Sequence, residues 1–250
     1  MKKINVLVVE DESIVAEDIR RTLEKLGYMV PSVVSSGEMA LEKIKEKDID
    51  IVFMDIVLKG EMDGIETASQ IRSRFNIPVV YLTAYSDEKI LQRAKITEPF
   101  GYIIKPFKER EIKINIEIAL YKHRIENELK ESKKFYESVL EGIVSGVWVT
   151  DRNDTISYAN KGLLTIMGLK PKQIVGIHVL KDFPEFFRPY YIKAKESLQP
   201  FYYQAVPFAF GGKDLSYQSG WLIPRIKDGN FDGMICTVES IPKYNRIDLY

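Results

Sequence analysis

Five polar side chains come directly after or at the end of short apolar runs in the first part of the sequence. Glu10 and Asp11 follow the first run, and Asp55 follows another. Thr83 and Lys105 stand at the ends of two later runs. Carboxylates that lie together repel one another unless a cation binds among them, and carboxylate oxygens with water suit Mg²⁺. A hydroxyl and an ammonium beside that cation could bind the oxygens of a phosphoryl group, so the set indicates phosphoryl chemistry if the fold brings it together.

The pattern around these residues predicts the elements that position them. From residue 1 to about residue 110, apolar runs alternate with amphipathic segments, such as the one that contains Ile14, Ile19 and Leu23. The five runs are Ile4–Val9, Met29–Val34, Ile49–Met54, Ile77–Leu82 and Phe100–Ile104. Apolar strands separated by helices are typical of a parallel sheet covered on both faces, so we expect a doubly wound α/β domain with five strands and five helices. The carboxyl ends of its strands meet at one edge, where the polar residues would converge.

Four motifs resemble the receiver domain of two-component response regulators. They are VLVVEDE at 6–12, FMDIVLKGEMDG at 53–64, VVYLTAY at 79–85 and GYIIKPF at 101–107. The resemblance covers residues 1–122 and implies a flavodoxin-like fold. It also implies that Asp55 is the phosphoacceptor and that Glu10 and Asp11 organise Mg²⁺. The metal's third protein ligand would be the backbone carbonyl of Val57.

The resemblance gives roles to three further residues. Thr83 would hydrogen-bond to the phosphoryl group, and Lys105 would pair with it. Tyr102 would be the switch aromatic that turns inward when the domain is phosphorylated. In that family the bond from Lys105 to Pro106 is cis. Phosphorylation adds roughly two negative charges, which would bias an equilibrium between two packings of the domain.

Two features depart from the usual pattern of the family. Lys59-Gly60 stands where a proline often follows the phosphoacceptor, and the loop as far as Asp63-Gly64 looks one residue longer. The acidic pair is Glu-Asp rather than Asp-Asp. The first departure concerns the shape of the loop and not the chemistry of the site, and the second is a variant that the family tolerates.

A long helix is expected after the receiver-like domain, because residues 109–140 contain neither Pro nor Gly. Apolar or small residues recur there at a spacing close to seven: Ile118, Ile125, Ser132 and Val139, with Leu129 and Tyr136 between them. A seven-residue apolar repeat is typical of a coiled coil, so we predict a helical linker that joins two chains in a homodimer. Lys122 and Ser132 interrupt the repeat, and the alternative is one amphipathic helix packed on its own domain.

The sequence changes in character after Gly142. Five segments are predicted to be strands: Val147–Thr150, Thr155–Ala159, Tyr202–Phe210, Ser216–Pro224 and Met234–Ser240. Three short segments are typical of hairpin turns: Asp151–Asp154, Gly211-Gly212 and Asp228-Gly229. Helical segments fall between Asn160 and Leu198, so we expect an α+β domain with an antiparallel sheet and helices on one face.

Residues 135–241 resemble a PAS domain. The resemblance rests on GVWVTDRNDTISYANKGLLTIMGL at 146–169 and on PKQIVG at 171–176, with Asn160 directly after the second strand. PAS domains bind flavin, haem, metabolites or partner proteins, or have no identified ligand. Light-sensing flavin binding requires a cysteine on the central helices, whereas Cys236 falls on the last strand. Haem would require an axial ligand such as His178, but a lone histidine is more often surface-exposed or hydrogen-bonded.

Aromatic residues are dense in the second half. They are Phe183, Phe186, Phe187, Tyr190, Tyr191, Phe201, Tyr202, Tyr203, Phe208 and Phe210. We interpret them as core and dimer interface, with an aromatic-lined pocket as the alternative. The PAS ligand therefore stays unknown at this point, and a domain without a ligand stays open.

Composition restricts the class of protein further. The length of 250 residues indicates about two domains. Thirty-six basic and thirty-six acidic residues give a net charge of zero, which argues against a large nucleic-acid-binding surface. A single cysteine excludes an internal disulfide and fits a reducing compartment. The sequence lacks both a signal peptide and an apolar stretch of about 20 residues, so we expect a cytoplasmic protein without membrane contact.

Together these features predict a response regulator of a phosphorelay. We expect a sensor histidine kinase to phosphorylate Asp55 and the PAS domain to act on a downstream protein target rather than on DNA. Residues 242–250 are too few for a helix-turn-helix. Beyond its own phosphotransfer and dephosphorylation, the chain is not expected to be an enzyme. One alternative is a regulator without output that acts as a phosphate sink, and another is a Mg²⁺-dependent phosphohydrolase, which would need Asp where Val57 stands.

Overall fold

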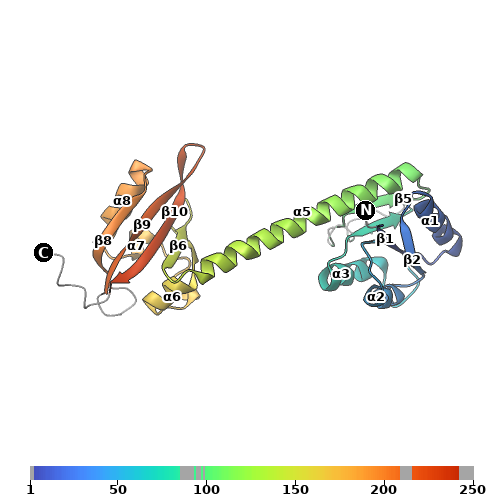
Figure 1. The fold of residues 1–250 in the computed structure, drawn as a ribbon, viewed down its shortest axis with the longest axis horizontal. Helices are drawn as coiled ribbons and strands as arrows, with labels where there is room; N and C mark the ends of the chain where they lie inside the picture. Colours follow the sequence, from blue (N-terminus) through green and yellow to red (C-terminus); the bar gives the residue numbers. More distant parts are fainter. Residues whose placement is uncertain (1–2, 85–92, 94–96, 98, 209–215, 242–250) are drawn as a thin grey trace. The chain divides into compact units, whose positions relative to one another are not determined.

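A computed structural model describes residues 3–84, 93, 97, 99–208 and 216–241 of the chain. The chain divides into two compact units, Met1–Glu131 and Ser132–Tyr250, which are described separately below. Figure 1 shows the elements of each unit along the chain. The predicted fourth helix of the first unit falls between Thr83 and Phe100 and lies mostly outside the described residues. Phe210 and the predicted turn at Gly211-Gly212 also lie outside them.

The first unit is built on a parallel sheet with the strand order β2-β1-β3-β4-β5. The strands are β1 (Asn5–Val9), β2 (Met29–Val34), β3 (Ile51–Asp55), β4 (Val79–Thr83) and β5 (Gly101–Ile104). All five residues of β3 are buried, as expected for a central strand covered on both faces. The predicted doubly wound, flavodoxin-like α/β fold is confirmed.

Helices cover both faces of this sheet (Figure 1). They are α1 (Ser13–Lys25), α2 (Gly37–Glu46), α3 (Gly64–Phe75) and the first part of α5 (Glu109–Gly142). On one face, α1 and α5 bury Ile19, Ile112 and Ile116 against the inward side chains of the strands. On the other face, α2 and α3 bury Ile44 and Ile71. The two apolar layers fix the strands, and therefore the edge at which their carboxyl ends meet.

The loop between β3 and α3 closes tightly under the end of the strand. Asp63 caps α3 by accepting a hydrogen bond from the amide of Glu66 (2.8 Å). The amide of Gly64 donates to the carbonyl of Ile56 (3.2 Å). A Cβ atom at Gly64 would clash with the carbonyl oxygen of Asp55, so glycine is the residue that lets α3 begin this close to β3.

The helix α5 is a single element of 34 residues. Its buried residues Ile112, Ile116 and Ala119 all lie near its amino-terminal end, where it packs on the sheet of the first unit. The long helix expected over residues 109–140 is therefore present and continues to Gly142.

The second unit contains an antiparallel sheet with the order β7-β6-β10-β9-β8. Its strands are β6 (Gly146–Thr150), β7 (Ile156–Ala159), β8 (Phe201–Phe208), β9 (Ser216–Lys227) and β10 (Asn230–Ile241). Between β7 and β8 lie α6 (Lys161–Met167), the short 3₁₀ helix η1 (Pro171–Gln173), α7 (Val179–Asp182) and α8 (Arg188–Ser197). These helices and the sheet share one apolar core, which confirms the predicted α+β arrangement.

The last two strands are longer than predicted. Prediction ended one strand at Pro224 and began the next at Met234, whereas β9 and β10 continue to the hairpin turn. Both turn residues, Asp228 (φ 51°) and Gly229 (φ 76°), have the positive φ that a tight two-residue hairpin requires. The residues that these two strands add beyond the prediction include several charged ones, so apolar and polar residues do not alternate there. A register shift before Met234 interrupts the alternation further.

Candidate functional site

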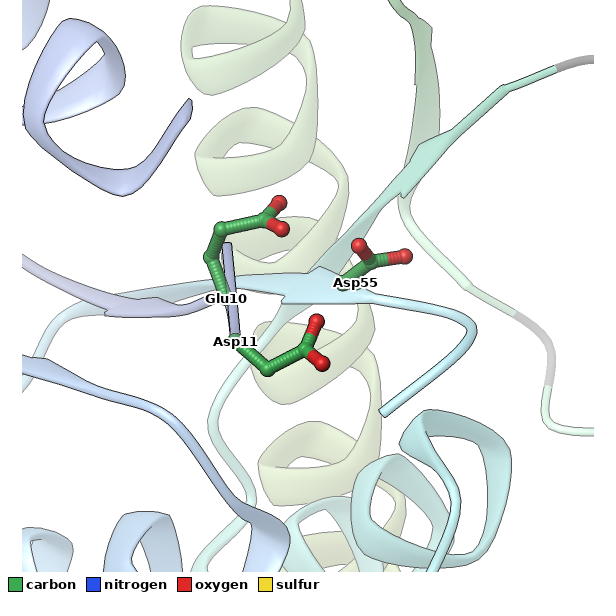
Figure 2. Close-up of side chains that lie close together, drawn as sticks. All are labelled: Glu10, Asp11 and Asp55. Atoms are coloured by element: carbon green, nitrogen blue, oxygen red, sulfur yellow. The ribbon is translucent and has the colours of Figure 1, made fainter. Parts of the chain in front are cut away.

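Three carboxylates meet at the carboxyl edge of the parallel sheet. Glu10 and Asp11 directly follow β1, and Asp55 ends β3. Figure 2 shows that their side chains lie close together, and one oxygen from each lies within 4.8 Å of the others. Glu10 and Asp55 are buried, with 2% and 8% of their surfaces exposed. The neighbouring positions of β1 and β3 in the sheet produce this cluster, as the sequence predicted.

The ammonium group of Lys105 lies between two of these carboxylates. It donates to Glu10 Oε2 at 2.5 Å and to Asp55 Oδ2 at 2.6 Å. Burial raises the pKa of Glu10 above its usual value, the hydrogen bond from Lys105 opposes that rise, and the charge of Asp55 adds to it. Burial alone would lower the pKa of Lys105, but its hydrogen bonds to the two carboxylates outweigh this effect and the pKa is raised. The bond between Lys105 and Pro106 is cis.

Asp11 has a cationic neighbour of its own. Lys59 Nζ lies 3.1 Å from Asp11 Oδ2, although 86% of the lysine side chain is exposed. From the sequence, Lys59 was noted only because it stands where the family often has proline, and no role in the site was predicted for it. A lysine on a loop follows no helical or strand period, so no pattern predicted this contact.

Backbone groups help to orient the acidic side chains. Asp55 Oδ1 accepts a hydrogen bond from the amide of Val57 (3.1 Å), and Glu10 Oε1 accepts one from the amide of Glu12 (3.3 Å). Val57, Thr83 and both lysines line the same pocket of about 230 Å³ as Asp11 and Asp55. A set of carboxylate oxygens beside a small polar pocket matches the oxygen ligands that Mg²⁺ prefers, so these residues fit that ion.

Tyr102 lies outside this pocket. Its ring packs on the core 5.8 Å from the ring of Tyr81 on the neighbouring strand. Its hydroxyl is buried and has no hydrogen-bond partner among the described residues. Burial raises the pKa of Tyr102. The predicted switch role of Tyr102 stays a prediction, as do the roles assigned to Thr83, Val57 and the residues of the acidic cluster.

The predicted aromatic residues of the second unit differ in how far they are buried. Phe183, Phe187, Tyr191 and Tyr203 are buried, and the ring of Phe187 lies 5.4 Å from that of Tyr203. Phe186 and Tyr202 are exposed. Trp148 packs beside Phe183 at 5.3 Å, and the cavity that these core rings border has a volume of about 10 Å³. Tyr190 and Phe201 pack partly buried against the same core, so most of the predicted aromatic side chains that the structure describes belong to the core.

Cys236 and His178, the residues considered as flavin or haem attachment points, lie on different elements of the second unit. Cys236 is fully buried in β10, and burial raises the pKa of its thiol well above the usual value. His178 precedes α7 and forms an isolated bridge with Thr155. Its Nδ1 atom is buried without a hydrogen-bond partner in the described part of the chain.

A five-stranded parallel sheet with an acidic cluster and a lysine at its carboxyl edge defines the receiver class of signalling domains. The sequence profile of the response regulator receiver domain matches residues 6–117. The profile of the PAS fold matches residues 134–195. The chain belongs to the response-regulator family, with a receiver domain followed by a PAS domain.

Two relatives and one solved structure are similar to parts of this chain. The heme response regulator HssR of Staphylococcus aureus is 30% identical over 176 residues, which cover 68% of this chain and 75% of the relative. The transcriptional regulatory protein PdtaR of Mycobacterium tuberculosis is 33% identical over 119 residues, 48% of this chain, and the match spans 58% of the length of PdtaR. The solved signal receiver domain of a modulated diguanylate cyclase from Desulfovibrio desulfuricans G20 is 38% identical, covers 50% of this chain and 99% of its own, and has a TM-score of 0.48.

No enzymatic output domain accompanies the receiver and PAS matches. Among the described helices, none has both the length and the hydropathy needed to cross a bilayer.

Proposed function

We propose that the chain is a response regulator whose Asp55 accepts a phosphoryl group from a sensor histidine kinase, with Mg²⁺ bound at Glu10, Asp11, Asp55 and the carbonyl of Val57. The observation that carries the proposal is the Lys105 ammonium held between two members of a three-carboxylate cluster. Membership of the receiver family supports a histidine kinase as the donor.

The reaction follows from the positions of these groups. A carboxylate oxygen of Asp55 forms a bond to phosphorus as the bond from phosphorus to the donor nitrogen breaks, and the imidazole leaves with the electron pair. Mg²⁺, when bound, supplies positive charge that stabilises the phosphoryl oxygens. Lys105 would move from its carboxylate partners to a phosphoryl oxygen, and Thr83 would donate a hydrogen bond to another. Most of the rate enhancement expected from such a site is positioning and charge neutralisation.

We place the output in protein–protein contacts made by the PAS domain and by a homodimer through α5. The exposed apolar residues of α5 and the neutral total charge support this choice over nucleic-acid binding. PdtaR is named a transcriptional regulatory protein, so DNA binding by the chain is the alternative output that a test must distinguish from protein–protein contacts. A phosphate sink without output would share the site but would lack a phosphorylation-dependent partner, and a pull-down with both states of the chain separates the two functions.

A phosphorylation assay tests the proposal. The purified chain is incubated with acetyl phosphate with and without Mg²⁺, and intact mass spectrometry counts the phosphoryl groups. One phosphoryl group is expected per chain, only with Mg²⁺, and none in the Asp55→Asn variant, which keeps the shape of the side chain but loses the nucleophile.

The matched control is Asp228→Asn, which removes a carboxylate from the exposed β9–β10 hairpin. That variant should be phosphorylated like the unaltered chain. Mg²⁺-dependent phosphorylation of Asp55→Asn at the normal level would show that the acceptor is another residue.

A further inference from the structure

We infer that Lys59 competes with Mg²⁺ for the carboxylate of Asp11. By pairing with that carboxylate, Lys59 raises the Mg²⁺ concentration at which the receiver site becomes occupied. The inference rests on the proposed function, because it concerns the same Mg²⁺ site. It deepens that function by assigning to a loop residue the control of metal affinity.

The first argument is the distribution of charge at the site. Lys105 donates one hydrogen bond to Glu10 and one to Asp55, so its single positive charge is shared between two carboxylates. Asp11 instead pairs with Lys59 at 3.1 Å. Three carboxylates and two ammonium groups leave one net negative charge, where Asp11 without Lys59 would leave two. A divalent cation is attracted more weakly to the first arrangement than to the second.

The second argument is the anchoring of the loop that carries Lys59. Met62, three residues further on, donates its amide to Glu38 Oε1 on α2 (3.1 Å). The hydrogen bond from the amide of Gly64 to Ile56 and the cap formed by Asp63 close the loop at α3. Hydrogen bonds thus fix the backbone on the α3 side of Lys59 to two helices. They restrict the positions of the loop, so the ammonium of Lys59 stays within reach of Asp11.

The third argument is that the contact can be broken. The side chain of Lys59 is 86% exposed, so the ammonium can return to water without unfolding any part of the loop. Mg²⁺ bound to Asp11 would repel an ammonium 3.1 Å from the same carboxylate, so both cations cannot occupy it favourably. Exposed ion pairs are weak, and the competition should therefore change metal affinity about two- to fivefold.

Isothermal titration of the full chain with MgCl₂ tests the inference. Lys59→Met removes the charge and keeps an unbranched side chain, and we expect its Kd for Mg²⁺ to fall about two- to fivefold. Lys59→Arg keeps the charge and should stay close to the unaltered chain. Lys43→Met is the matched control, because it removes an exposed ammonium that pairs with Glu46 on α2 (2.7 Å), and it should leave the Kd unchanged.

A double variant shows whether the effect passes through Asp11. In an Asp11→Asn background, Lys59→Met should no longer tighten Mg²⁺ binding. If Lys59→Met binds Mg²⁺ with unchanged or weaker affinity in the Asp11 chain while phosphorylation of Asp55 stays normal, the inference about Lys59 is wrong and the proposed function stands. If the unaltered chain neither binds Mg²⁺ nor becomes phosphorylated, both are wrong.

Discussion

A buried carboxylate requires a cation next to it, because an unpaired charge in a protein interior is costly. Asp55 is 8% exposed and satisfies this requirement through Lys105, while the amide of Val57 orients its other oxygen. The same lysine also binds Glu10. Lys105 therefore binds two carboxylates before any phosphoryl group is present. A phosphoryl group would compete with these carboxylates for the ammonium, which is already in position.

The two acidic residues that follow β1 should contribute unequally to metal binding. Glu10 is 2% exposed and engaged by Lys105, whereas the side chain of Asp11 lines the pocket and pairs with the exposed Lys59. We predict that Asp11→Ala weakens Mg²⁺ binding at least tenfold and slows phosphorylation by acetyl phosphate more than Glu10→Ala does. Calorimetric titration and initial phosphorylation rates measure this, and equal, unchanged affinities in both variants would contradict the metal site.

Sequence patterns could predict most of this site because each residue stands at the end of a strand. Glu10, Asp55 and Lys105 directly follow or end apolar runs, and parallel strands necessarily bring such ends to one edge. Lys59 could not be placed in the same way. Its contact with Asp11 depends on the path of a loop, and loops lack the periodicity that assigns a side chain to one face.

At the scale of elements, one residue joins the end of α5 to the PAS sheet. Asn160 is fully buried, and its Nδ2 donates to the carbonyls of Leu140 (2.9 Å), Ile143 (3.2 Å) and Ser145 (3.1 Å). Its Oδ1 accepts from the amides of Val147 (2.8 Å) and Leu163 (2.9 Å). One side chain thus forms hydrogen bonds with backbone groups at the end of α5, at the start of β6 and in the first turn of α6.

We predict that Asn160→Ala destabilises the PAS unit by ~3 kcal/mol or more, because it leaves several buried backbone groups without partners. Both tryptophans of the chain, Trp148 and Trp221, belong to this unit, so urea unfolding followed by tryptophan fluorescence reports on it. Asn153→Ala, in the exposed turn after β6, is the control and should change the unfolding free energy by less than ~0.5 kcal/mol. Equal unfolding free energies of the two variants would disprove that the hydrogen bonds of Asn160 stabilise the PAS unit.

Sequence reasoning identified Asn160 as typical of a PAS domain but could not predict what it binds. Three of its five partners are main-chain carbonyls between residues 140 and 145, where the helix ends and the chain turns into β6. Main-chain carbonyls carry no sequence signal of their own. The strands and helices of both sheets were predictable because their apolar residues repeat, whereas the junctions between them depend on hydrogen bonds that any residue type can supply.

At the scale of the whole molecule, α5 offers a surface for self-association. Its apolar stripe consists of exposed residues spaced by three, four or seven: Ile118, Ile125, Leu129, Tyr136 and Val139. At about 100° per residue, this stripe lies on the side of the helix away from Ile112, Ile116 and Ala119, which pack on the receiver sheet. The receiver therefore leaves the stripe uncovered along its own part of the helix. Between 43% and 70% of the surface of each stripe residue is exposed, as on an unpaired coiled-coil face.

The charged residues that flank the stripe favour a parallel pair of helices in register. If Leu129 and Ile125 occupy the a and d positions of a heptad, Glu128 takes position g and Lys133 takes the following position e. In a parallel coiled coil these two positions face each other across the interface, so Glu128 of each chain would meet Lys133 of the other. Lys122 and Ser132 lie on the stripe itself and should weaken the association.

We therefore predict a weak, concentration-dependent homodimer that Leu129→Glu abolishes, because it places like charges opposite each other on the stripe. Lys134→Glu, an exposed substitution off the stripe, is the control and should leave the dimer intact. Glu128→Lys should weaken the dimer, and adding Lys133→Glu should restore it, because the reversed pairs attract again only if the helices are parallel and in register. Light scattering over a concentration series, with and without beryllofluoride as a phosphoryl mimic, measures each state. A monomer at high micromolar concentration in both conditions would reject the dimer, and a double variant no better than Glu128→Lys alone would reject the parallel register.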